Sequence, residues 1–154
     1  MITYYFDASA IAKRYLREPG NRWVMGLMSA PTANHVTSIE LVTVELVSAL
    51  TKAHRERRIS SSYRERLIGR ALADSRTDIG LLAVSQTILD LATELATRHP
   101  LRAYDAIHLA AVLDWTHDLT EVDLPAPIFV SADENLLAAA RAEGLVAENP
   151  NEHE

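Results

Sequence analysis

The sequence of 154 residues contains no cysteine. A chain without cysteine forms no disulfide, no thiolate zinc site and no cysteine nucleophile, so its chemistry must come from other side chains. No apolar run approaches the roughly 18 residues that cross a bilayer. Asp7 also interrupts the N-terminal apolar stretch before a signal peptide could form. We therefore expect a cytoplasmic protein without a membrane segment.

Aromatic residues are scarce, at 6% of the chain, which argues against an extended platform for stacking nucleic-acid bases. Hydrophobic residues make up 48% and charged residues 23%, an ordinary globular composition that excludes disorder and collagen-like repeats. A chain of this length forms one domain of usual size. We expect that domain to span residues 1–148, followed by a frayed polar tail at 149–154.

Short apolar segments alternate with helical patterns along the chain. The patterns predict strands at 2–6, 36–38, 80–84, 128–130 and 145–146. They predict helices at 8–16, 39–54, 62–76, 86–98, 103–115 and 133–143, with an acidic loop at 116–127. This alternation favours an α/β fold in which helices cover both faces of a parallel sheet. In such sheets, ligand sites form beyond the carboxyl ends of the strands.

Acidic residues occur where this rule places a site. Asp7 follows the first strand, Asp133 follows the fourth after two residues, and Asp105 lies in the first turn of the helix at 103–115. Each of them could also be a helix cap, because aspartate accepts hydrogen bonds from free backbone N–H groups at helix N-termini. Glu45 is different, since it lies within a helix that is apolar on nearly every side. A carboxylate in such a position is costly to bury unless another group compensates it.

If these four carboxylates converge, protons or a cation must neutralise their repulsion. Oxygen ligands without cysteine or paired histidine suit the hard ions Mg2+ and Mn2+ better than zinc. Glu40 and Glu134 are interpreted differently, because each follows Thr37 or Ser131 at the spacing of a capping box. We therefore assign both glutamates to helix caps.

Four segments together carry a family resemblance. They are Tyr5–Ala10, Val44–Leu50, Tyr104–Ala110 and Phe129–Leu137. In this order they resemble the four acidic motifs of the PIN-domain ribonucleases, and the chain as far as about Pro150 is similar to the VapC toxins of toxin–antitoxin modules. The resemblance implies a three-layer α/β/α sandwich with a central, mainly parallel sheet. It also implies metal-dependent RNA cleavage, a homodimer and inhibition by an antitoxin.

By motif position, the resemblance gives the metal-binding and catalytic roles to Asp7, Glu45, Asp105 and Asp133. It gives a supporting hydroxyl role to Ser131. The oxygen-only donor set makes Mg2+ or Mn2+ the expected cofactor. Many relatives have a further acidic residue shortly after the fourth motif, whereas Asn135 and Leu136 follow Glu134 here. The number of metal ions, one or two, therefore stays open.

Two further residues are supporting candidates. Ser9 could donate a hydrogen bond to Asp7 or be an ordinary first-turn residue of its helix. His108 lies three residues after Asp105 and could orient a phosphate or a water molecule. We favour a packed, hydrogen-bonded core histidine, because a metal-generated hydroxide needs no histidine base.

The net charge of −6 is unevenly distributed. Residues 52–76 contain eight basic and three acidic residues, a net charge of +5, so the rest of the chain carries −11. Within this stretch, Arg55, Arg57, Arg58 and Arg64 are candidates for contacting RNA phosphates. Docking of an acidic antitoxin and simple solvation are the alternatives.

Two other functions compete with the nuclease. Acidic residues at strand ends also bind Mg2+ in receiver-like phosphoacceptors, but no lysine occurs after Lys52 to partner an acyl phosphate. A catalytically silent module that keeps the fold and binds a partner is the third possibility.

Overall fold

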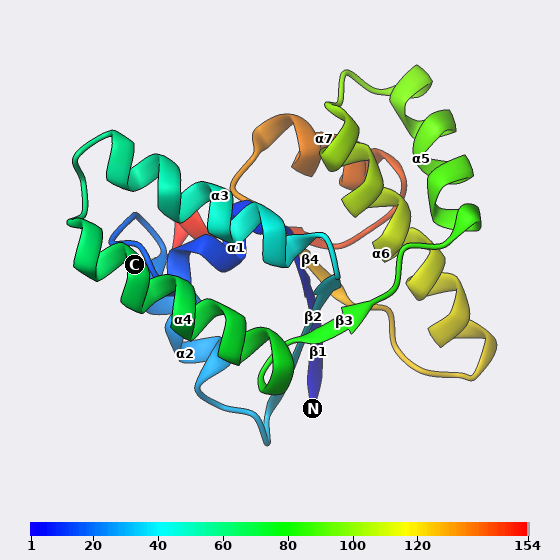
Figure 1. Ribbon diagram of the computed structural model, residues 1–154. Coiled ribbons are helices and arrows are strands. Elements are labelled where there is room, and N and C mark those ends of the chain that lie inside the picture. Colours follow the sequence, from blue (N-terminus) through cyan, green and yellow to red (C-terminus); the bar gives the residue numbers. More distant parts are fainter. Residues whose placement is uncertain (154) are drawn as a thin grey trace.

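The structure is a computed structural model that describes residues 1–153 (Figure 1). Its strands are β1 (Ile2–Phe6), β2 (Asn34–Ile39), β3 (Gly80–Leu82), β4 (Ile128–Val130) and β5 (Ala147–Glu148). Its α-helices are α1 (Ala8–Ile11), α2 (Asn21–Met28), α3 (Val42–Arg55), α4 (Ser61–Thr77), α5 (Gln86–Arg98), α6 (Ala103–Glu121) and α7 (Glu134–Ala142). Two 3-10 turns, η1 (Ala12–Arg14) and η2 (Pro150–Glu152), complete the elements.

The five strands form one parallel sheet in the order β3-β2-β1-β4-β5. The chain builds the sheet outward from β1 through β2 to β3, then returns to the other side of β1 for β4 and β5. The order therefore reverses between β1 and β4. In open parallel sheets a ligand crevice forms at this kind of reversal.

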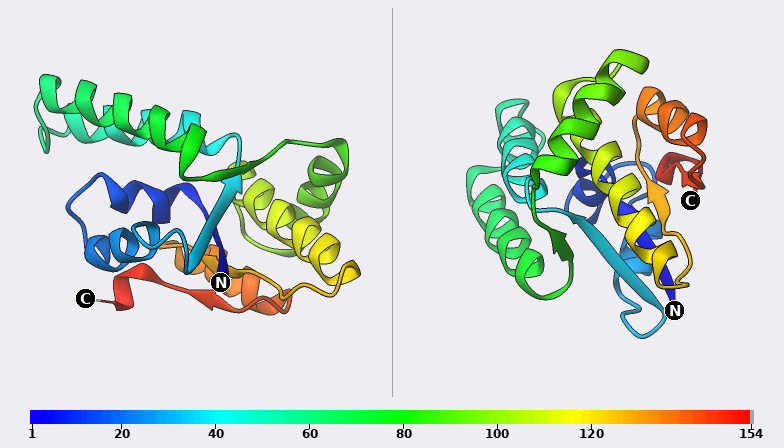
Figure 2. Two further views of the ribbon diagram at one scale, coloured as in Figure 1. Left: turned by 90° about the horizontal axis from the view of Figure 1, so that it is seen from below. Right: turned by 90° about the vertical axis from the view of Figure 1, so that its right-hand side faces the viewer.

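Helices cover both faces of the sheet, which confirms the predicted three-layer α/β/α sandwich (Figures 1 and 2). Side chains of β1 alternate between the layers. Tyr4 and Phe6 pack under α1–α4, whereas Tyr5 packs under α5–α7. Tyr4, Tyr5 and Phe6 are all buried, so the second half of β1 is covered on both faces, as in parallel sheets.

Helices α3 and α4 lie side by side and run in opposite directions (Figure 1). Leu46, Leu50 and Leu67 contribute to their shared apolar core. The two helices carry the basic stretch at 52–76, so these charges lie on one helical pair beside the sheet.

Several predicted boundaries were wrong. The helix predicted from Ile39 begins only at Val42, because Ile39 pairs with Leu82 as the last residue of β2. Helix α6 continues to Glu121, so half of the predicted acidic loop is helical. The last strand lies at 147–148 and not at 145–146, and α2 was not predicted.

The C-terminal tail is ordered as far as it is described, so the prediction of fraying was wrong. Asn149 is buried, and its Nδ2 donates a hydrogen bond of 2.6 Å to Glu134 Oε1. The ring of His153 stacks on Trp23 with 4.1 Å between centroids. Glu154 lies outside the described residues. Among residues 1–153, no helix combines the length and the apolar character needed to span a bilayer.

Candidate active site

The site begins where β1 and β4 end side by side. The backbone N–H of Asp7 donates a hydrogen bond of 3.1 Å to Val130 O, so the chain leaves both strands at the same level. Asp7 then caps α1, and Ser131 follows β4 directly. The reversal of strand order thus brings Asp7 and Ser131 together from positions 124 residues apart.

Asp7 is a buried carboxylate, only 3% exposed, held by three donors. Its Oδ1 accepts from the backbone N–H of Ala10 at 2.9 Å and from the Ser9 hydroxyl at 2.7 Å. Its Oδ2 accepts from the Ser131 hydroxyl at 2.6 Å. Burial raises the pKa of the Asp7 carboxyl, and nearby His108 together with these donors only partly opposes the rise. Asp7 is therefore the predicted cap of α1 and also accepts hydrogen bonds from both serine hydroxyls.

The two serines also attach Asp7 to the start of α7. The Ser131 hydroxyl accepts from the backbone N–H of Asp133 at 3.0 Å, and the Ser9 hydroxyl accepts from that of Ala132 at 2.9 Å. The side chain of Asp133 in turn caps α7 by accepting from Leu136 N–H at 2.9 Å. Asp7 and Asp133 are therefore positioned by one hydrogen-bond network.

Glu45 is held by a buried histidine. His108 is 2% exposed, and its Nε2 lies 2.7 Å from Glu45 Oε1 while its Nδ1 lies 3.0 Å from the Tyr5 hydroxyl. In the neutral ring, Nε2–H donates to Glu45 and Nδ1 accepts from Tyr5. Burial lowers the pKa of His108, but the hydrogen bond to Glu45 and the negative charges of Glu45, Asp7 and Asp105 outweigh it, so the pKa is raised. The expectation of a packed core histidine is confirmed.

Tyr5 is a site residue that the sequence did not reveal. Burial, followed by the charges of Asp7 and Glu45, raises the pKa of its phenol well above the ordinary value. The hydroxyl therefore stays protonated and fixes His108. In the sequence, Tyr5 is one apolar-pattern residue of a strand, and only its hydroxyl could have suggested a polar role.

Asp105 and Asp133 share one arginine. Arg102 Nε lies 3.1 Å from Asp105 Oδ2, and Arg102 Nη2 lies 3.5 Å from Asp133 Oδ2. The sequence analysis did not single out Arg102. The spacing could have predicted its pairing with Asp105, because side chains three residues apart lie on the same face of a helix.

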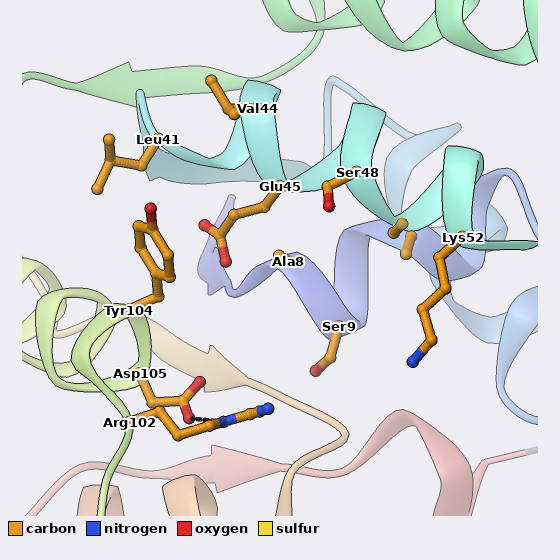
Figure 3. A pocket seen from close by; sticks show the side chains of 12 residues that line it. Ala8, Ser9, Leu41, Val44, Glu45, Ser48, Lys52, Arg102, Tyr104 and Asp105 are labelled. Atoms are coloured by element: carbon orange, nitrogen blue, oxygen red, sulfur yellow. Dashed lines mark hydrogen bonds and ion pairs between the residues drawn. The ribbon is translucent and has the colours of Figure 1, made fainter.

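Two of the four carboxylates, Glu45 and Asp105, line a pocket of about 590 Å3, and Asp7 and Asp133 are not among its lining residues. Figure 3 shows Glu45 on α3 and Asp105 at the start of α6 on the lining of this pocket, with Ser9 on α1 and Lys52 further along α3. Within residues 1–153, no three aspartate, glutamate, histidine or cysteine side chains gather closely enough to hold a metal ion together. Arg102 pairs with Asp105 and Asp133, and His108 bonds to Glu45, whereas Asp7 is held by serine hydroxyls and a backbone N–H.

The donor set nevertheless suits a hard divalent cation, because it consists of carboxylate oxygens without sulfur. Glu45, Asp105 and Asp133 each bond to a cationic or proton-donating side chain, and Asp7 is buried among hydroxyls. Each candidate ligand therefore already has a partner within the protein.

The capping roles assigned to Glu40 and Glu134 were wrong. Thr37 belongs to β2, and Glu40 Oε1 instead accepts from Val84 N–H at 3.0 Å, which ties β2 to the segment after β3. Glu134 accepts from Asn149, since Asp133 itself caps α7. Both glutamates hold neighbouring segments through tertiary contacts.

The arginines at 55, 57, 58 and 64 do not line the pocket. Arg58 pairs with Glu18 at 2.8 Å, and Arg64 pairs with Glu65 at 2.7 Å. From the basic stretch, Lys52 is the residue that reaches the pocket lining. Contact of the four arginines with RNA stays a prediction.

The chain was compared with known proteins and structures. VapBC2 from Rickettsia felis, solved bound to a DNA fragment from its promoter, has a chain with 15% identity and a TM-score of 0.61, covering 96% of this chain and 98% of that one. FitAcB from Neisseria gonorrhoeae matches at 13% identity and a TM-score of 0.61, with 97% and 98% covered. A toxin–antitoxin complex from Klebsiella pneumoniae matches at 16% identity and a TM-score of 0.54, with 96% and 97% covered.

At these identities the structural matches show the fold. No curated protein matches the sequence. The family model described as the PIN domain matches residues 4–142, which is most of the chain and includes all four predicted carboxylates. The protein therefore belongs to the PIN domain family.

Proposed function

We propose that this PIN domain is a divalent-metal-dependent endoribonuclease and the toxin of a toxin–antitoxin pair. The observation that carries the proposal is the buried Asp7 carboxylate, held by Ser9 and Ser131 at the reversal of strand order. Glu45 and Asp105 line the adjacent pocket. A site that concentrates negative charge needs a cation before it can accept an RNA phosphate.

Asp7, Glu45, Asp105 and Asp133 are the groups that would hold Mg2+ or Mn2+. Such an ion polarises a phosphodiester and lowers the pKa of the attacking water. The protein contributes rigid positioning. Ser9 and Ser131 fix Asp7, and His108 with Tyr5 fixes Glu45. These contacts restrict the motion of Asp7 and Glu45, which lowers the cost of positioning both carboxylates for an ion.

The role as a toxin is supported by the matched structures, since VapBC2 and FitAcB are similar in fold over almost the whole chain. The matched structure from Klebsiella pneumoniae is a toxin–antitoxin complex. We accordingly propose a cytoplasmic homodimer that an antitoxin protein inhibits.

Incubation of the purified chain with end-labelled single-stranded RNA tests the proposal. We expect cleavage with Mn2+ or Mg2+ and none with EDTA. Absence of cleavage with either ion would refute the nuclease. Phosphorylation of the protein by acetyl phosphate, without RNA cleavage, would favour a phosphoacceptor. Absence of both reactions would favour a catalytically silent module that binds a partner.

Expression in bacterial cells tests the role as a toxin. The wild type should arrest growth, as should Glu40→Gln, because Glu40 lies outside the site. Asp7→Asn should not arrest growth. Normal growth of cells that contain folded, nuclease-active wild-type protein would contradict the toxin role while leaving the nuclease intact.

A further inference from the structure

Arg102 joins two carboxylates that come from different elements. It precedes α6, whose first turn carries Asp105, and it also reaches Asp133 at the start of α7. The guanidinium lies 3.1 Å from Asp105 and 3.5 Å from Asp133. It is thus a positive charge placed between two of the proposed metal ligands.

We propose that Arg102 is a resident counterion, which neutralises Asp105 and Asp133 in the metal-free protein and is displaced when a divalent ion binds them. The inference rests on the proposed function, because it takes the two aspartates as metal ligands. It assigns Arg102 a regulatory role: the arginine competes with the ion and so lowers the metal affinity of the site.

The exposure of the three side chains supports displacement. Arg102 is 82% exposed, whereas Asp105 is 17% and Asp133 is 29% exposed. The arginine can therefore turn into solvent without leaving a cavity, while the aspartates stay in place. Ion pairs of an exposed side chain are weak, so the two pairs of Arg102 oppose its displacement only modestly.

The aspartates are also held without Arg102. Asp133 accepts from Leu136 N–H, and its own N–H donates to Ser131. Asp105 lies in the first turn of α6, where the helix dipole favours a negative charge. Removal of the arginine therefore leaves two positioned, unpaired carboxylates.

Arg98 provides a matched control. It is also an exposed arginine, 51% exposed, and it pairs with Glu143 at 3.3 Å. It does not line the acidic pocket, whereas Arg102 does. A purely structural ion pair would behave alike at both positions.

Calorimetric titration with Mn2+ of wild type, Arg102→Gln and Arg98→Gln tests the proposal. We expect Arg102→Gln to bind Mn2+ about fivefold to tenfold more tightly than wild type, a gain of about 1–1.4 kcal/mol. Arg98→Gln should match wild type. Arg102→Lys should fall between wild type and Arg102→Gln, since one ammonium is a poorer bridge for two carboxylates than a planar guanidinium.

Thermal unfolding adds a second readout that needs no RNA. Without metal, Arg102→Gln should melt below wild type, because Asp105 and Asp133 lose their counterion. With saturating Mn2+ its melting temperature should rise by more than that of wild type.

The outcomes separate this inference from the proposed function. If wild type binds Mn2+ and cleaves RNA but Arg102→Gln binds Mn2+ no more tightly, the counterion role is refuted and the nuclease stands. If neither protein binds Mn2+, both proposals fall. Equal tightening in Arg98→Gln would show a general effect of charge and would also refute the specific role of Arg102.

Discussion

Replacement of Glu45 by glutamine is a sensitive probe of the site, because Glu40 offers a control in the same part of the chain. The amide of Glu45→Gln keeps the shape of the side chain and can still accept from His108 Nε2–H. It removes the negative charge that the histidine and the proposed metal ion both need. The two functions of the carboxylate can therefore be measured in one variant.

The structure sets the expected magnitudes. The hydrogen bond from His108 to Glu45 is 2.7 Å long and its histidine is buried. Hydrogen bonds to charged groups contribute about 1.5–3 kcal/mol and neutral ones about 0.5–1.5, so the variant should lose about 1 kcal/mol of stability. Loss of even an outer partner of a metal ligand costs about 10–100-fold in affinity, so Mn2+ should bind at least about tenfold more weakly.

Glu40→Gln should behave differently. Its amide oxygen can still accept from Val84 N–H, so stability should change by less than about 0.5 kcal/mol. Mn2+ affinity should equal that of wild type. Denaturant unfolding and calorimetry measure both quantities. Equal Mn2+ affinities in the two variants, or weaker binding in Glu40→Gln, would refute the assignment of Glu45.

Three other changes test separate parts of the structure. Ser131→Ala removes the 2.6 Å hydrogen bond to the buried Asp7 carboxylate and should cost about 1–3 kcal/mol in denaturant unfolding, whereas unchanged stability would contradict the support of Asp7 by this hydroxyl. A ligand at about a hundredfold excess over its Kd stabilises a protein by about 2.7 kcal/mol, so Mn2+ should raise the melting temperature of wild type and raise it less in Asp133→Asn. Equal changes in melting temperature in the two proteins would show that Asp133 only caps α7 and binds no ion. Burial and the neighbouring Asp74 raise the pKa of Tyr15, so the folded state keeps this proton when the unfolded chain loses it. The free energy of unfolding should therefore fall as pH rises above about 10, and less steeply in Tyr15→Phe, whereas identical slopes would contradict the raised pKa.

Local sequence signals predicted the parts of the site that depend on one segment. The apolar run before Asp7 predicted β1. Ligand sites form beyond the carboxyl ends of parallel strands, so Asp7 after β1 and Asp133 after β4 were predicted to lie near each other. Both aspartates are also the predicted caps, because the free N–H groups of α1 and α7 lie next to them. The apolar surroundings of Glu45 indicated that its carboxylate needs a partner, and the structure supplies a hydrogen bond from His108, a pairing that the sequence did not predict.

Contacts between distant segments escaped prediction. Glu40 has the spacing of a capping box, yet its partner is Val84, 44 residues away. The polar composition of residues 149–154 predicted a frayed tail. In the structure, Asn149 is hydrogen-bonded to Glu134 and His153 stacks on Trp23. Such pairings depend on which strands are neighbours, and no local periodicity encodes that information.

The boundary at Ile39 shows a second limit. Its apolar character suits the end of a strand as well as the start of a helix, and periodicity alone does not separate the two. Pairing with Leu82 in the sheet decides for the strand. Arg102 was missed for a related reason, because its bridge from Asp105 to Asp133 exists only once α6 and α7 are placed together.

The rate of cleavage of single-stranded RNA by Asp7→Asn, with Mn2+ present, tests the central claim most directly. The variant keeps an oxygen to cap α1 but removes the buried charge at the centre of the proposed metal site. Unfolding in denaturant establishes first that the variant is folded. We predict that the folded variant loses cleavage while Glu40→Gln retains the wild-type rate. Cleavage by folded Asp7→Asn at the wild-type rate would contradict the claim that these carboxylates form a metal-dependent nuclease site.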